Sequence, residues 1–498
     1  MRLLCLALIT TKMKYKRIPL VFAITFYIFS GSQAQPEPLT AYQMINRAMK
    51  YVGDIQSKDL QLSIAIITPE GKNRGQSYYP GPPYRPYRIE TRFEIDRQNG
   101  KEVAQFINPF NGFVFGGFHV LQDGRYTAYD VISSTARAIK SLGFENYRHF
   151  PHTYLGRALR DTANLVYEGV FPFREGQAHV VKLRGDRELK LFLDPKTFAL
   201  LQIVHQTVNH PYGDGSTVKK YYDYREFGQL RLPTRFESGG LYQSWGSLLN
   251  SYEIVERVNS ISLPDLNEFR QLDGDYAPAK MVSLAENIHM IQNIGDDKWG
   301  IFDYNVLVAE FEDHILVGEA PVSNAASHKA IAMIRDQFPS KPIRYLVQSH
   351  HHSDHVAGVR DYMAQEVTLV VASATQALFE RIAKAPWRYE PDTLSKSPKE
   401  PKLLVINEPM TLRDGLNEAT ILNIGPIPHV NDMLAIYFPK QQLVWQADMI
   451  TYCEWPLSIE PSVIFRERLS AYSWTVKTIA GTHGQVLKGK ALEDYLKD

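Results

Sequence analysis

The sequence predicts an α/β protein with a mainly antiparallel β amino-terminal part and a carboxyl-terminal part in which strands alternate with helices. Three observations lead to this prediction. Short, aromatic-rich strands separated by turns recur before about residue 275, apolar strands ending in polar residues follow it, and helical periodicity lies between some of those strands. With 498 residues, 44% of them hydrophobic and 22% charged, the chain is long enough for two or three domains.

Residues 1–34 have the pattern of a secretory signal peptide, with Met13 as an alternative start. A basic stretch at 14–17 precedes an apolar run at 18–29, and residues 32–34 offer a small-x-small cleavage site. An apolar run of about twelve residues is too short to span a bilayer, so cleavage is expected in preference to an uncleaved anchor. We therefore expect a periplasmic or secreted protein that begins near Gln35 and has no transmembrane span.

A mainly β domain is expected over residues 35–275. Alternating or aromatic-rich runs indicate antiparallel hairpins, and turn signals separate the later ones. These runs are residues 87–95, 178–183, 189–193, 201–205 and 218–222. Helical pieces are expected at residues 41–51 and 133–142. No strong catalytic constellation stands out in this part of the sequence.

Part of this domain is similar to the outer-membrane lipoprotein carrier-like fold, an incomplete β-barrel around an apolar cavity. The resemblance rests on residues 191–200 and 221–233. It implies a cavity for a hydrophobic ligand lined by aromatic side chains. The alternative is ordinary sheet packing, which is the more common role of tyrosines in strands.

A second domain is expected over residues 280–498, after a polar break with Gly and Pro at residues 272–278. The pattern predicts a strand at residues 281–285, a hairpin over residues 305–317 that turns at Glu312 and Asp313, and an amphipathic helix at residues 324–337.

The most informative stretch follows the next apolar strand, at residues 345–347. A His-x-His-x-Asp-His pattern stands where this strand bends into a helix expected at residues 356–363; it comprises His350, His351, His352, Ser353, Asp354 and His355. His350 and His352 lie two apart in an extended segment, so they project to the same side. Imidazoles with a carboxylate suit zinc or another borderline divalent metal. The alternative is an exposed histidine-rich turn that binds no metal.

Three more strand ends carry residues of metal-ligand type. His429 follows the apolar segment 419–424 and a Gly-Pro turn, Asp448 ends the strand at residues 443–448, and His483 follows the strand that starts at Ile479. Polar residues at strand ends are the usual location of chemistry on α/β scaffolds. Each alone is more commonly a surface or strand-capping residue. Their order after the first motif indicates one shared site.

With these motifs, residues 280–498 resemble the metallo-β-lactamase fold superfamily of metallohydrolases. The resemblance implies an αββα sandwich with two divalent metal ions, zinc above all, at one edge of the two sheets. It implies that His350, His352 and His429 hold the first metal, and that Asp354, His355 and His483 hold the second. Asp448 would touch both.

The chemistry of this superfamily implies hydrolysis of a small-molecule ester, lactone, thioester, amide or phosphoester by a metal-bridging hydroxide. The expected catalytic residues are Asp354, which would orient the hydroxide, and Asp448. Zinc β-lactamases that degrade antibiotics carry a cysteine where Asp448 stands, and the nearest thiol is Cys453, which weakens a true β-lactamase assignment. His352 replaces the carboxylate typical of the diiron branch, which favours hydrolysis over redox chemistry.

Two other functions remain open from the sequence. One is a carrier of a lipid-like ligand with an accessory metal domain, and the other is a redox accessory protein with iron in the same cage. The net charge of +1 does not favour nucleic acid or a membrane surface as a partner. After signal cleavage Cys453 would be the remaining cysteine, so no disulfide within the chain is expected.

A proline-rich, charged segment at residues 384–402 contains Trp387 and Tyr389. It is either a lid that supplies aromatic contacts to the substrate or a solvated connector whose aromatic side chains pack locally. Trp455, after Asp448, is a second candidate for the wall of a substrate pocket.

Overall fold

The computed structural model describes residues 39–497 apart from 76, 85, 111–112, 132–133, 140–148, 258, 272–277, 297–300, 451–459 and 485. The expected signal peptide and the residues Cys453 and Trp455 lie outside the described part, as does most of the expected break at residues 272–278. No helix within the described ranges is long and apolar enough to cross a bilayer.

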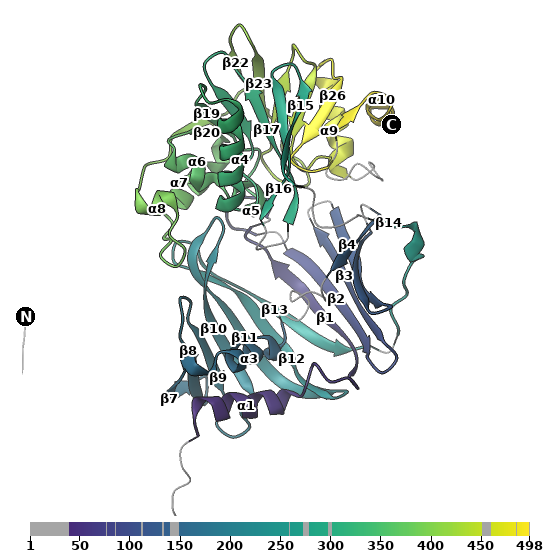
Figure 1. Cartoon of the computed structure of the whole chain (residues 1–498), viewed down its shortest axis with the longest axis vertical. Coiled ribbons are helices and arrows are strands. Elements are labelled where there is room, and N and C mark those ends of the chain that lie inside the picture. The colour runs from purple at the N-terminus through teal and green to yellow at the C-terminus, as the bar shows by residue number, and fades with distance from the viewer. Residues whose placement is uncertain are drawn as a thin grey trace, which may run out of the picture. The chain divides into compact units, whose positions relative to one another are not determined.

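A 14-stranded sheet dominates the amino-terminal part (Figure 1). Its strands are β1 Gln61–Lys72, β2 Pro86–Asp96, β3 Lys101–Phe110, β4 Phe113–Gln122, β5 Arg125–Asp130, β6 Thr135–Ile139, β7 Leu165–Phe173, β8 Gly176–Leu183, β9 Leu189–Leu193, β10 Leu200–Asn209, β11 Gly213–Phe227, β12 Leu230–Tyr242, β13 Gly246–Glu256 and β14 Arg270–Gln271. The order in space is β14-β6-β5-β4-β3-β2-β1-β13-β12-β11-β10-β9-β8-β7. Every pairing is antiparallel except that of β14 with β6, which confirms the mainly antiparallel β prediction.

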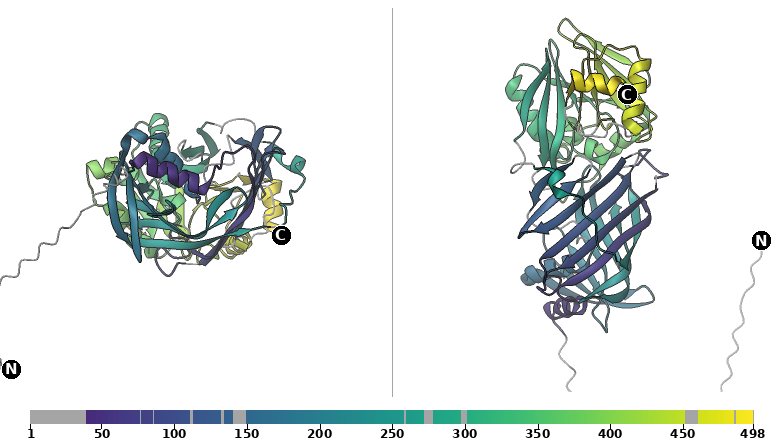
Figure 2. Two further views of the ribbon diagram at one scale, coloured as in Figure 1. Left: turned by 90° about the horizontal axis from the view of Figure 1, so that it is seen from below. Right: turned by 90° about the vertical axis from the view of Figure 1, so that its right-hand side faces the viewer.

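Helix α1 (Ala41–Val52) confirms the helix expected at residues 41–51. It begins with a reciprocal cap in which Thr40 Oγ1 accepts from the Gln43 N–H and Gln43 Oε1 accepts from the Thr40 N–H. The apolar face of α1 is buried, and α1 packs on α3 (Pro151–Arg160). Figure 2 shows α1 lying across the concave side of the large sheet.

The helix expected at residues 133–142 is wrong where the structure describes it, because Thr135–Ile139 forms strand β6. This segment pairs antiparallel with β5 and in parallel with β14, and Ala136 is buried. Ala, Arg and Lys favour a helix in isolation, but the hydrogen bonds to neighbouring strands and the burial of Ala136 outweigh that local preference.

Two further sheets follow in the carboxyl-terminal part. The seven-stranded sheet contains β15 Lys280–Ala285, β16 Ile288–Asp296, β17 Ile301–Glu310, β18 Ile315–Gly318, β19 Ile343–Val347, β20 Thr368–Ala372 and β21 Leu403–Ile406, in that order. The six-stranded sheet contains β22 Met410–Arg413, β23 Glu418–Asn423, β24 Leu434–Phe438, β25 Leu443–Gln446, β26 Thr478–Gly481 and β27 Leu487–Lys488. The expected strand at residues 281–285 and the hairpin over residues 305–317 are confirmed.

The helices of this part are α4 Asn324–Gln337, α5 Ser353–Val356, α6 Val359–Ala364, α7 Gln376–Lys384, α8 Thr393–Lys396, α9 Glu460–Ala471 and α10 Lys490–Lys497. Short 3₁₀ turns lie at Thr162–Asn164, Leu266–Glu268 and Ser373–Thr375. The predicted helix at residues 324–337 is confirmed with the same bounds as α4. Its cap is Ser323, whose Oγ accepts from the Ala326 N–H.

Alternation along the strands produces four layers. On β17, Val306 packs with the apolar residues of α4, α6 and α7, while its neighbour Leu307 packs with strands of the six-stranded sheet. On the far side of the six-stranded sheet, Val444 packs with Phe465 of α9 and Tyr495 of α10. This arrangement of helices, two sheets and helices is the predicted αββα sandwich.

The helix expected at residues 356–363 is interrupted, so α5 and α6 are separate. A Cβ on Gly358 would collide with Ser327 Oγ and with the carbonyl oxygen of Ser323. Glycine at this position therefore permits the close approach of Ser323 and of Ser327 in α4.

Candidate metal centre

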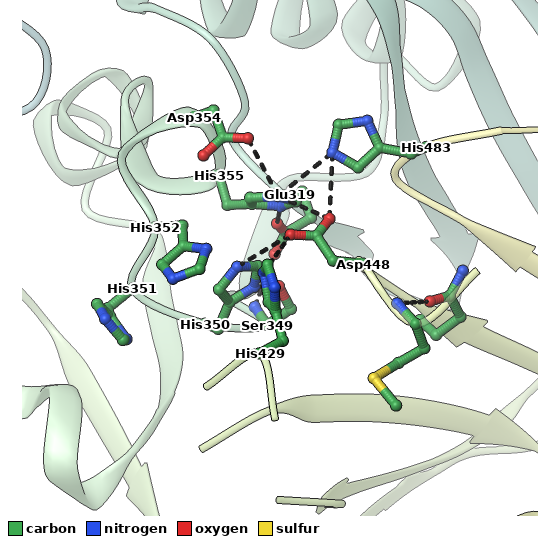
Figure 3. Close-up of polar contacts among 12 residues, drawn as sticks. Glu319, Ser349, His350, His351, His352, Asp354, His355, His429, Asp448 and His483 are labelled. Atoms are coloured by element: carbon green, nitrogen blue, oxygen red, sulfur yellow. Dashed lines mark hydrogen bonds and ion pairs between the residues drawn. The ribbon is translucent and has the colours of Figure 1, made fainter. Parts of the chain in front are cut away.

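The seven expected ligands come together after the carboxyl ends of four strands (Figure 3). β19 is followed by His350, His352 and, in α5, Asp354 and His355; β23, β25 and β26 are followed by His429, Asp448 and His483. β19, β25 and β26 end in buried residues, and Leu422 near the end of β23 is buried too, so the polar side chains that follow are held at one edge of the sandwich.

Four of the seven side chains form a first group, His350, His352, His429 and Asp448. All four are buried, and each offers one ligand atom that lies within 4.8 Å of the others. Ser349 Oγ lies 2.9 Å from His350 Nδ1, while His350 Nε2 is directed toward Asp448 Oδ2 at 3.3 Å.

A second group consists of Asp354, His355 and His483. His355 is fully buried, whereas the side chains of Asp354 and His483 are 29% and 14% exposed. The metal centre is therefore open to solvent on the side of the second group.

Asp448 lies between the two groups. Its Oδ2 is 2.8 Å from His429 Nε2 in the first group, and its Oδ1 is 3.0 Å from His355 Nε2 and 3.2 Å from His483 Nε2 in the second. Each carboxylate oxygen thus faces a different set of imidazoles, so Asp448 links the two groups of candidate ligands.

Charges in the centre are strongly coupled. Burial opposes ionisation of Asp448, but the adjacent His355, His350 and His429 hold its pKa well below the ordinary value. Burial and the neighbouring His355 hold the pKa of His350 well below its usual range. Burial and the neighbouring His429 and His350 lower that of His352 in the same way. Neutral imidazoles beside an ionised carboxylate are the protonation states that metal binding needs.

His355 differs from these two histidines. Although burial opposes its charged form, Asp448, Asp354 and Glu319 raise the pKa of His355 well above the usual value. Three carboxylates thus surround the His355 ring and favour a positive charge close to it. A divalent cation bound beside His355 would supply such a charge.

Glu319 was not expected from the sequence. It directly follows β18 and is buried, with Oε2 at 2.5 Å from His355 Nδ1. Its Oε1 accepts from the Ser349 N–H at 2.6 Å and from Gln348 Nε2 at 3.0 Å. Glu319 therefore fixes both the His355 ring and the start of the histidine motif. A polar residue immediately after an apolar strand is the same signal that identified Asp448, so the sequence did contain a clue.

Two residues of β17 were also missed. The Tyr304 hydroxyl donates to Asp354 Oδ2 at 2.9 Å, and its ring lies 4.3 Å from that of His483. Asn305 Nδ2 donates to the carbonyl oxygens of Gly481 and Gly484 and so holds the loop that carries His483. No sequence spacing links β17 to these loops, so pattern analysis had no means of finding either contact.

His351 stands inside the motif but has a different role from its neighbours. Its Nε2 donates to the carbonyl oxygen of Ser77 at 2.7 Å, and burial lowers the pKa of the ring to about 4. His351 is therefore a neutral, buried anchor of the motif and belongs to neither group of candidate ligands.

The donor set fits zinc. The first group offers three imidazoles and one carboxylate in a buried cluster, and the second offers two imidazoles and one carboxylate in addition to the shared Asp448. Such nitrogen and oxygen ligands at converging positions suit Zn²⁺, and Glu319 behind His355 is the kind of outer partner that orients metal-binding histidines.

The tryptophan of the segment at residues 384–402 packs away from the candidate metal centre. Trp387 is 2% exposed and packs with Val208 and Ala385, and its ring lies 4.7 Å from that of His210. The backbone N–H of Tyr389 donates to the buried Asp214. These contacts favour the connector interpretation over the lid interpretation.

No family model and no curated protein matches this chain. Solved structures that it resembles include a metallo-beta-lactamase from Pontibacter korlensis, at 13% identity and a TM-score of 0.34 over 44% of this chain and 98% of that one. A metallo-beta-lactamase from Hirschia baltica is 17% identical with a TM-score of 0.33, over 44% and 97% of the two chains. FIM-1 from Pseudomonas aeruginosa, solved in a mono-zinc form, is 16% identical with a TM-score of 0.32, over 45% and 96%. We assign the metallo-β-lactamase fold to the carboxyl-terminal part on the αββα layers and the arrangement of its seven side chains.

Proposed function

We propose that this protein is an exported hydrolase that depends on two zinc ions and cleaves an ester, lactone, thioester, amide or phosphoester in a small molecule. One observation carries the proposal, namely the position of Asp448, whose two oxygens face two separate groups of imidazoles. Export is proposed from the signal-peptide pattern of residues 1–34.

His350, His352 and His429 would hold the first ion, Asp354, His355 and His483 would hold the second, and Asp448 would contact both. When bound, such ions supply a water molecule of lowered pKa and polarise the oxygen of the substrate. Ionised Asp448 contributes a buried negative charge, and the protein keeps it ionised through the surrounding imidazoles.

Asp354 is the group we assign to orienting the attacking water. It lies on the open side of the centre, and its carboxylate is fixed by the Tyr304 hydroxyl at Oδ2. A carboxylate that is held in place and accessible to solvent accepts a hydrogen bond from water without reorganising during the reaction.

The substrate class is tested by assaying the purified protein with an ester, a lactone, a thioester, an amide and a phosphodiester. Turnover should disappear on treatment with a chelator and return on addition of zinc. Turnover that survives complete removal of metal would contradict the proposal. Copurified lipid without any metal-dependent turnover would favour a carrier function, and iron with consumption of oxygen would favour redox chemistry.

A further inference from the structure

The described part of the loop between β1 and β2, residues 73–75 and 77–84, contacts the backbone of the candidate metal-binding motif. The Ser353 N–H donates to the carbonyl oxygen of Gly75 at 2.7 Å, and the Asn431 N–H donates to that of Tyr78 at 3.0 Å. Ser353 lies between His352 and Asp354, and Asn431 lies two residues after His429. The β1–β2 loop is therefore hydrogen-bonded to two of the segments that carry candidate ligands.

A third carbonyl of this loop reaches a candidate ligand directly. Ser77 O lies 3.0 Å from His352 Nε2 and 2.7 Å from His351 Nε2. A carbonyl oxygen accepts and never donates, so both ring nitrogens carry a proton. In a neutral imidazole the lone pair then belongs to the other nitrogen, which for His352 is Nδ1.

The amino-terminal sheet holds the β1–β2 loop in place. Arg74 is buried, and its Nη2 donates to the carbonyl oxygens of Trp245 and Gly246 at 2.9 and 3.2 Å. Its guanidinium also lies over the ring of Tyr242, 5.6 Å from the centroid. Trp245 in turn belongs to the apolar core that contains Val356 at the end of α5.

Residues from the two parts of the chain thus share one core and one compact unit, Thr40–Asp498. Among the candidate ligand side chains, the loop hydrogen-bonds to that of His352, a buried member of the first group. Asp354 and His483 of the second group keep their exposure.

We propose that the β1–β2 loop is a constituent of the metal centre, in which the backbone carbonyl of Ser77 makes Nδ1 of His352 the ligand atom and thereby sets the affinity of the first metal position. This inference rests on the proposed function. It assigns the amino-terminal sheet a positioning role in metal binding, and it leaves the side of Asp354 and His483 as the approach for a substrate.

Gly75 offers a way to displace the loop without altering a ligand. A Cβ at this position would lie 2.6 Å from Ser353 Oγ and 3.0 Å from Ser353 Cβ, so the branched side chain of Gly75→Val crowds Ser353 and is expected to push the loop away from the motif. The matched control is Gly81→Val in the same loop, because a Cβ on Gly81 meets nothing within 4 Å. The double variant Gly75→Val with Ser353→Gly removes both obstructing atoms and serves as the rescue, compared with Ser353→Gly alone.

The readout is zinc affinity by chelator competition, with hydrogen exchange of residues 73–79 as the report on loop displacement. Gly75→Val should bind one zinc about 10- to 100-fold more weakly, the loss typical of an outer-shell partner, with the other site less affected. Gly81→Val should bind zinc with the affinity of the wild type, and the double variant should regain most of the zinc affinity that Gly75→Val loses. If Gly75→Val does not fold, the milder Gly75→Ala replaces it in the same cycle.

Unchanged affinity at both sites in a variant whose loop exchanges faster would overturn the inference. Equal weakening without rescue by Ser353→Gly would also overturn it, because it would indicate a general loss of stability. A wild-type protein that binds two zinc ions but hydrolyses nothing would defeat the proposed function. The zinc affinities of the loop variants would still test the role of the loop in that case. A wild-type protein that binds no zinc would overturn both.

Discussion

Glu319 Oε2 lies 2.5 Å from His355 Nδ1, and the glutamate is 1% exposed. The contact leaves Nε2 of His355 directed toward Asp448 Oδ1 at 3.0 Å. Glu319 has a φ of +81°, a backbone conformation that costs a non-glycine residue energy. Strain at this position is balanced by the hydrogen bonds that Glu319 accepts from Ser349 and Gln348.

Replacing Glu319 by Gln should weaken binding of one zinc ion by about 10- to 100-fold, because His355 loses the carboxylate that orients its ring. Chelator competition measures the effect, with Glu312→Gln, at an exposed acid in the turn before β18, as the matched control. Equal zinc affinities in the two variants would show that Glu319 does not orient the ligand.

Asp448→Ala should lower the metal content at both positions and abolish turnover, because Asp448 faces both groups. The test is metal per chain by mass spectrometry alongside turnover, with the exposed Asp59→Asn as control. A fully active Asp448→Ala variant with its full metal content would defeat the two-metal assignment.

The ionised carboxylate of Asp361 in α6 should lower the free energy of unfolding at neutral pH. Burial raises the pKa of its carboxyl from 3.8 to about 6. The folded state therefore holds this proton more tightly than the unfolded state, and the free energy of unfolding falls as pH rises from about 4 to 6. Asp361→Asn, which cannot ionise, should be more stable than the wild type at pH 7 by up to about 3 kcal/mol.

Urea unfolding of the metal-free proteins measures this difference, and it should shrink as the pH is lowered from 7 toward 4. With metal-free samples, the effect of Asp361 titration on the free energy of unfolding is not mixed with the destabilisation caused by acid-induced release of metal. A difference in unfolding free energy that does not change with pH would rule out titration of Asp361 as its origin.

Trp387→Ala should destabilise the fold by about 3–5 kcal/mol, because a large buried side chain leaves a cavity. The KM of metal-dependent turnover should stay the same, since Trp387 contacts Val208 and Ala385 rather than the metal centre. A raised KM with unchanged thermal stability would instead support the lid interpretation.

The sequence predicted those features whose signals are local. Helix α4 was found with its bounds because Ser323 caps it and its apolar residues recur with a helical period. The seven candidate ligands were identified because the first motif is compact and the other three residues end apolar strands. The failed helix at residues 133–142 shows the limit of local preference, since neighbouring strands decide the conformation of β6.

Contacts between segments far apart in the chain could not be predicted from the sequence. Ser77 lies 275 residues from His352 and acts through a backbone carbonyl, which carries no side-chain signature. Tyr304 and Asn305 likewise depend on how β17 is placed beside the loops that carry Asp354 and His483. The predicted domain limits, signal peptide and lipoprotein carrier-like resemblance remain predictions.

Metal content per chain, measured by mass spectrometry on the purified mature protein, tests the central claim most directly. The account predicts about two zinc ions per chain, together with turnover that a chelator abolishes. A folded protein that contains no metal, takes up none from a zinc solution and hydrolyses nothing would contradict it.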